Sequence, residues 1–186
     1  MLIDIHAKTS RSSDVKISAN EVARRAAEVG FDGIAVCDRL SSAHAQEVLN
    51  ACEKHGIKGF IGVEIPTENG VLLGFMPEVG EFYLAEEWRQ ITEISVPPAD
   101  VALKMFRDAG GAVIASRPYD LKIPHNMGDL LFQLGDIQGV EVFNSGVGQM
   151  QCDFGRYMVG CAARSTAYCS CVVHRTCQLG ALQLDP

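Results

Sequence analysis

Short apolar runs alternate with helical patterns along most of this chain, and most of the runs are followed directly by a charged or polar side chain. This alternation is typical of β/α units, in which successive strands build a mostly parallel sheet. The predicted strands span residues 2–6, 33–36, 60–63, 70–75, 112–115, 139–143 and 167–173. The pattern therefore restricts the chain to an α/β fold around one main sheet.

Helix-boundary signals lie between the apolar runs. Ser18 and Glu21 have the spacing of a capping box, and Gly30 follows the end of the helical pattern that begins there. Apolar residues recur at helical spacing in the later segments as well. The expected helices span about 18–30, 42–56, 98–110, 126–134 and 149–163.

The composition fits a single soluble domain. The chain has 186 residues, of which 47% are hydrophobic, and this is enough for one full core. No stretch approaches the roughly 20 apolar residues that cross a bilayer, and the first residues lack the basic and apolar regions of a signal peptide. We therefore expect a cytoplasmic protein that makes no membrane contact.

Charge and cysteine content narrow the choice of partners. The net charge of −7 argues against a wide basic surface, so nucleic acid is not indicated as a partner.

Five of the seven cysteines lie in the last 35 residues. Without a secretion signal, free thiols are favoured over a disulfide framework. We regard residues 151–186 as a divergent, Cys-rich end of the domain.

An acidic segment over about 77–98 interrupts the alternation. It contains five glutamates and one arginine, together with Tyr83 and Trp88. Such a segment is usually a solvated surface insertion, and we expect one helix within it. A role in binding a protein partner is the alternative.

The residues with useful chemistry share one location, because they follow the carboxyl ends of predicted strands. In a β/α barrel these ends form one face, and that face holds the active site. Lys8 and Asp14 lie in the loop after the first strand. The strand-end residues are His6, Asp38, Arg39, Glu64, Arg117, Asn144 and His174.

These motifs resemble the PHP (polymerase and histidinol phosphatase) domain family. The family pattern has His-x-His, Ser-Asp, Thr-Asp-His, Gly-x-Glu, Ala-His-Pro, Val-Glu-Val-x-Asn and Ser-Asp-Ala-His in this order. The corresponding positions here are His6-Ala7-Lys8, Ser13-Asp14, Cys37-Asp38-Arg39, Gly62-Val63-Glu64, Ser116-Arg117-Pro118, Val140-Glu141-Val142-Phe143-Asn144 and Cys171-Val172-Val173-His174. The resemblance covers almost the whole chain.

The resemblance implies a fold and an activity. Members of the family are distorted seven-stranded β/α (TIM-like) barrels, so we expect residues 1–186 to form one PHP-like domain. Members use two or three metal ions to hydrolyse phosphate esters. The expected partner is therefore a small phosphorylated molecule or phosphate.

The sequence departs from the family pattern at the metal site. Lys8, Arg39 and Arg117 stand where histidines are expected, and Val172 stands where an aspartate is expected. Ammonium and guanidinium groups have no lone pair for a metal ion and repel it. The remaining candidate metal ligands are His6, Asp14, Glu64 and His174, enough for one divalent ion (manganese, zinc or iron) or for none.

Three interpretations remain open. In the first, the domain has lost metal-cluster catalysis, and Lys8, Arg39 and Arg117 bind a phosphate or carboxylate. In the second, it is an active phosphoesterase that holds one ion and uses Asp14 or Asp38 as the base. In the third, it is a regulatory or scaffold module that acts through residues 77–98.

Overall fold

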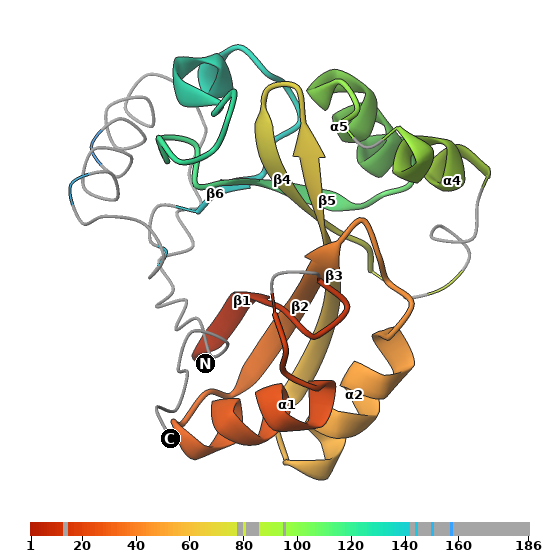
Figure 1. Cartoon of the computed structure of the whole chain (residues 1–186), viewed down its shortest axis with the longest axis vertical. Helices are drawn as coiled ribbons and strands as arrows, with labels where there is room; N and C mark the ends of the chain where they lie inside the picture. The colour runs from red at the N-terminus through yellow and green to blue at the C-terminus, as the bar shows by residue number, and fades with distance from the viewer. Residues whose placement is uncertain are drawn as a thin grey trace.

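The computed structural model describes residues 1–12, 15–77, 80, 86–94, 96–141, 144, 150 and 157. Within this part of the chain, six strands form one sheet in the order β1-β2-β3-β4-β5-β6 (Figure 1). They are β1 (Ile3–Ala7), β2 (Gly33–Arg39), β3 (Lys58–Thr67), β4 (Gly70–Phe75), β5 (Ala112–Ser116) and β6 (Gly139–Val140). The strand expected over 167–173 and the helix expected over 149–163 lie outside the described residues, apart from Met150 and Tyr157.

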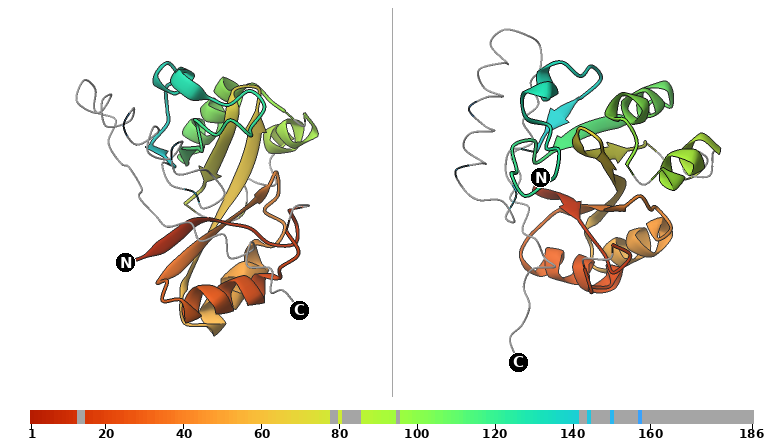
Figure 2. Two further views of the ribbon diagram at one scale, coloured as in Figure 1. Left: turned by 60° about the vertical axis from the view of Figure 1, so that its left-hand side comes forward. Right: turned by 45° about the horizontal axis from the view of Figure 1, so that its top comes forward.

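The direction of the strands brings five carboxyl ends to one edge of the sheet. β1 pairs parallel with β2, β2 with β3, and β5 with β6. β4 runs antiparallel to both β3 and β5, so β3 and β5 point the same way. The sheet curls into a half-barrel (Figure 2). The mixed α/β prediction is thus confirmed, whereas closure into a seven-stranded barrel is not.

The antiparallel strand β4 follows β3 through a tight hairpin. Thr67 pairs with Gly70 across the turn, and the Thr67 hydroxyl donates to the Gly70 carbonyl at 2.8 Å. Gly70 has a φ of +105°, and a Cβ there would lie 2.9 Å from the backbone nitrogen of Met127. Only glycine fits this turn without strain.

Two helices cover the β1–β3 half of the sheet. They are α1 (Ala19–Glu28) and α2 (Ala45–Lys54), and they lie side by side in Figure 1. Their apolar faces pack with Ile34, Val36 and Ile61 into one core cluster. The predicted N-cap is confirmed, because the Ser18 hydroxyl accepts from the Glu21 amide at 3.2 Å. The Glu21 carboxylate pairs with Arg24 and Arg25.

The β4–β5 half is covered by α4 (Glu86–Glu93) and α5 (Ala99–Asp108). Trp88 and Phe106 meet edge to face with ring centroids 6.1 Å apart. A Cβ on Gly74 would lie 2.3 Å from Phe106, so this strand position must be glycine. The helix expected in the acidic segment is α4. Its apolar face is buried rather than solvated, because Trp88 and Ile91 are only 4% and 3% exposed.

Two of the expected helices are shorter than the sequence pattern suggested. α2 begins at Ala45 rather than near Ser42. The segment expected to be helical over 126–134 forms a short 3-10 helix, η1 (Gly128–Phe132). Its start coincides with Gly128, whose φ of +50° is incompatible with a continuous α-helix. Among the described residues, every helix is too short or too polar to cross a membrane.

Candidate functional site

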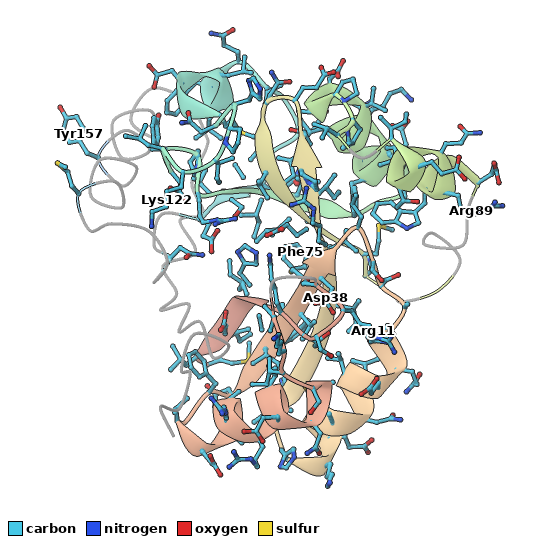
Figure 3. All side chains as sticks on the ribbon, viewed as in Figure 1. Arg11, Asp38, Phe75, Arg89, Lys122 and Tyr157 are labelled. Carbon is cyan, nitrogen blue, oxygen red and sulfur yellow. The ribbon has the colours of Figure 1, made fainter. Side chains whose placement is uncertain are left out.

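The carboxyl edge of the sheet gathers most of the predicted site residues. His6 lies on β1, Asp38 and Arg39 end β2, Glu64 lies on β3, and Arg117 follows β5. β3 continues to Thr67, so Glu64 is inside the strand rather than at its end as predicted. In Figure 3 the side chain of Asp38 lies at this edge, between the two halves of the molecule.

His6 lies between two buried glutamates. Its Nε2 is 3.0 Å from Oε2 of Glu64, and its Nδ1 is 3.1 Å from Oε1 of Glu141. Burial alone would lower the pKa of His6, but the two carboxylates outweigh it and raise the pKa from 6.5 to about 9. An imidazole held in this way carries protons on both nitrogens at neutral pH and has no lone pair to offer.

Glu64 is surrounded by cations. The Lys8 ammonium lies 3.0 Å from its Oε1, and Nη2 of Arg117 lies 3.7 Å from its Oε2. Burial would raise the pKa of Glu64, but the hydrogen bond from His6 and the charge of Lys8 outweigh it and lower the pKa to about 2. Glu64 is therefore ionised, and its charge is neutralised by side chains of the chain itself.

Glu141 belongs to the site, and our sequence analysis did not select it. Its carboxylate accepts hydrogen bonds from Ser116 Oγ at 2.6 Å and from Asn144 Nδ2 at 2.9 Å, and it contacts His6. Burial would raise the pKa of Glu141, but the charge and the hydrogen bond of His6 keep it below its usual range. The sequence pattern placed Glu141 inside a strand over 139–143, whereas β6 ends at Val140; the available signal was the Val-Glu-Val-x-Asn motif that contains Glu141.

The Asp38 carboxylate accepts three hydrogen bonds from the loop that follows β1. Its Oδ1 accepts from the Thr9 amide at 2.8 Å and from Ser12 Oγ at 2.9 Å, and its Oδ2 accepts from Thr9 Oγ1 at 2.6 Å. Asp38 is only 4% exposed. In this geometry its carboxylate anchors the loop and has little capacity left for a reacting group.

The two arginines of the site have different surroundings. Arg117 has a φ of +45°, its Nη1 lies 3.7 Å from Asp120, and its side chain is 20% exposed. Arg39 is exposed and makes no ion pair within the described residues. Asp14 and His174 lie outside the described residues, so their expected roles remain predictions.

These residues do not fit a metal cluster. In the described part of the chain, no group of three or more His, Cys, Asp or Glu side chains is arranged to hold a metal ion. His6 and Glu64 could supply only two ligands, and Lys8 lies within ion-pair distance of Glu64. An ammonium there repels a divalent ion and satisfies the carboxylate in its place.

Comparisons with known proteins agree with this fold. An 18% identical structure from Bifidobacterium adolescentis, described provisionally as a metal-dependent phosphoesterase, superposes with a TM-score of 0.66 over 87% of this chain and 83% of its own. A 17% identical amidohydrolase from Chromobacterium violaceum, solved with bound sulfate and no metal, superposes with a TM-score of 0.70 over 95% of this chain and 88% of its own. At these identities the likeness shows the fold alone.

The sequence itself matches the family model of the PHP domain. The match spans residues 4–104, which include the strands that carry His6, Asp38 and Glu64. A search of curated proteins found no match to this chain. Since the matched residues make up more than half of the 186, the chain belongs to the PHP domain family.

Proposed function

We propose that this PHP domain binds a small phosphate-bearing anion at the carboxyl ends of its strands and that fixed cations replace the metal cluster there. The observation that carries the proposal is the 3.0 Å contact between the Lys8 ammonium and Glu64, with Arg117 on the other carboxylate oxygen. Metal-cluster hydrolysis of phosphate esters is then lost or reduced.

The electrostatics of Glu64 support this replacement. A buried carboxylate needs a counter-charge, and in metal-dependent phosphoesterases a divalent ion can supply it. Here Glu64 is 3% exposed, and His6 and Lys8 supply the counter-charge, with Arg117 3.7 Å away. An ammonium neutralises a carboxylate but does not lower the pKa of a bound water as a metal ion does. The charge of Glu64 is therefore balanced without a metal ion, which is the group that would convert a bound water into a hydroxide nucleophile.

Anion binding is supported by the cations that reach solvent. Arg39 is exposed, and the side chains of Lys8 and Arg117 are 17% and 20% exposed. Guanidinium groups suit phosphate because they donate two parallel hydrogen bonds. The Chromobacterium violaceum amidohydrolase was solved with bound sulfate and no metal, so a protein of this fold can bind a tetrahedral anion without a metal ion. Because Glu64 and Glu141 offset part of the positive charge, we expect weak affinity for inorganic phosphate, with a Kd on the order of 1 mM.

The second candidate is an active phosphoesterase with one metal ion. One observation favours it: Glu141 holds Nδ1 of His6, so Nε2 faces Glu64, and carboxylates orient metal-binding histidines in this way by holding the ring nitrogen that does not bind the metal. This candidate also needs His174 as a ligand and Asp14 or Asp38 as the base. The seventh strand over 167–173 would then close the barrel and bring His174 to the site.

Two measurements separate the candidates. The first is hydrolysis of p-nitrophenyl phosphate with and without added manganese, with His6→Ala as the background control. The second is calorimetric titration with inorganic phosphate in the presence of a chelator. We expect turnover no faster than in the His6→Ala variant, together with phosphate binding that the chelator does not change. Manganese-dependent turnover that His6→Ala abolishes would establish the second candidate and overturn the first.

A further inference from the structure

Glu141 connects three separate parts of the site. It directly follows β6, and its backbone amide donates to the Ala115 carbonyl at 2.8 Å, which fixes it beside the end of β5. Its side chain then reaches His6 on β1, Ser116 on β5 and Asn144 beyond β6. The residue is only 3% exposed, so its carboxylate depends on these three partners rather than on water.

The two carboxylate oxygens of Glu141 have different partners. Oε1 lies 3.1 Å from His6 Nδ1 and 2.9 Å from Asn144 Nδ2, so one oxygen holds both pocket side chains. Oε2 accepts from Ser116 at 2.6 Å and lies 3.3 Å from the same His6 nitrogen. With Ser116 holding Oε2, Oε1 is fixed in position for the other two residues.

Glu141 determines how the His6 ring and the Asn144 carboxamide are oriented. A ring nitrogen bound to a fixed carboxylate cannot rotate without losing that bond, so the opposite nitrogen of His6 is held toward Glu64. A carboxylate accepts but does not donate, so the amide nitrogen of Asn144 must face it. The carboxamide oxygen of Asn144 is thereby directed away from Glu141.

We propose that Glu141 is the positioning residue at these strand ends: through Oε1 it fixes the orientations of His6 and Asn144, and through His6 that of Glu64, beside which Lys8 and Arg117 are held. It does not touch the ligand itself. Its effect on phosphate affinity rests on the proposed function, whereas its hold on the His6 ring does not.

Two substitutions of similar volume separate positioning from core packing. Glu141→Gln keeps an oxygen at the Oε1 position and loses the charge, whereas Glu141→Met fills similar space without an acceptor. The readout is the ring Cε1–Hε1 signal of His6 in a proton–carbon correlation spectrum. The chain has five histidines, and the signal of His6 is the one that disappears in His6→Asn.

Positioning predicts one sharp His6 signal in the wild type and in Glu141→Gln, and a broadened or doubled signal in Glu141→Met. Phosphate affinity should fall about tenfold in Glu141→Met and stay within a few-fold in Glu141→Gln, as for other side chains that orient a binding group. An unchanged His6 signal in a folded Glu141→Met protein would overturn the proposal. Wild-type protein that binds no phosphate would contradict the proposed function and leave the spectroscopic test intact.

A third variant keeps the test decisive if Glu141→Met does not fold. Glu141→Asp keeps the charge but shortens the side chain by one methylene, so its carboxylate no longer reaches His6 and Asn144 together. The His6 signal should again broaden or double, with weaker phosphate binding. A single sharp signal with wild-type affinity in Glu141→Asp would show that the position of the acceptor is irrelevant, and it would overturn the proposal.

Discussion

The Lys8 ammonium lies 3.0 Å from Oε1 of Glu64, so a loop lysine neutralises a strand carboxylate that is buried at the carboxyl edge of the sheet. His6 contacts the other oxygen of the same carboxylate at 3.0 Å. The strand ends of this PHP domain are thus organised by ion pairs between side chains. The stability of the domain and its response to metal ions should both depend on Lys8.

Lys8→Met should destabilise the domain. The substitution leaves Glu64 buried with fewer counter-charges, while His6 and Arg117 still compensate in part. We expect a loss of about 1–3 kcal/mol in the free energy of unfolding, measured by urea denaturation. Lys54→Met is the control, because within the described residues Lys54 makes only an exposed hydrogen bond to Asn20, and its loss should change stability by less than about 0.5 kcal/mol. Equal losses in both variants would contradict the assigned role of Lys8.

A smaller substitution at the same position should open a cation site. Lys8→Ala removes the ammonium and leaves space beside Glu64, where a divalent ion can provide the missing counter-charge. We expect manganese or zinc to raise the melting temperature of Lys8→Ala and to leave that of the wild type unchanged. The account fails on this point if the ions stabilise both proteins to the same extent.

The stability of the domain should fall at alkaline pH because of His6. Its pKa is raised to about 9 in the folded state from 6.5, so the folded protein binds the proton more tightly. This contribution is fully present below about pH 6.5 and is lost as the pH rises through about 9. Urea unfolding at a series of pH values should show the loss in the wild type and a flatter profile in His6→Gln. A wild-type profile as flat as that of the variant would contradict the ion pairs of His6 with Glu64 and Glu141.

Glu64 should affect stability at the acidic end. Its pKa is lowered to about 2 from 4.5, so its contribution is present above about pH 4.5 and is lost as the pH falls toward 2. Glu64→Gln should therefore be less stable than the wild type at neutral pH, and the difference should shrink on acidification. A difference that stays constant between about pH 6 and pH 3 would mean that the charge of Glu64 is not what stabilises the fold.

Asp38 should act as a loop anchor. Asp38→Asn removes the charge, and its amide nitrogen must either face the Thr9 backbone N–H or reverse the hydrogen bond with Thr9 Oγ1, so the three hydrogen bonds are weakened. We expect a loss of about 1–3 kcal/mol and faster proteolysis of the loop after β1. Glu53→Gln, at an exposed carboxylate without a side-chain partner among the described residues, is the control. Unchanged stability and protease resistance in Asp38→Asn would mean that Asp38 does not anchor the loop and is available to act as a base.

The element types could be predicted from the sequence because they depend on local pattern. The apolar runs at Ile3 and Gly33 give β1 and β2, and the Ser18 cap gives the start of α1. The antiparallel direction of β4 was missed, although the tight turn before Gly70 determines it. The inward face of α4 depends on Phe106, which lies on a different helix, and no local pattern reveals such a contact.

Most residues of the site could be predicted from the sequence, but the ion pairs and hydrogen bonds between them could not. Strand ends could be recognised one by one, so His6, Asp38 and Glu64 were found. Which carboxylate pairs with which cation depends on the directions of side chains on different strands, and the sequence does not contain that information directly. Glu141 was missed for this reason: its importance follows from its contacts with His6 and Asn144, and these appear only once β1 and β6 are placed at the same edge.

His6, Lys8 and Arg117, rather than a metal ion, balance the charge of Glu64. The most direct test of this charge balance is elemental analysis of protein purified without chelator and then dialysed against manganese and zinc. We expect substoichiometric metal in the wild type and a marked increase in Lys8→Ala. About one equivalent of metal in the wild type, lost in His6→Ala, would contradict this charge balance.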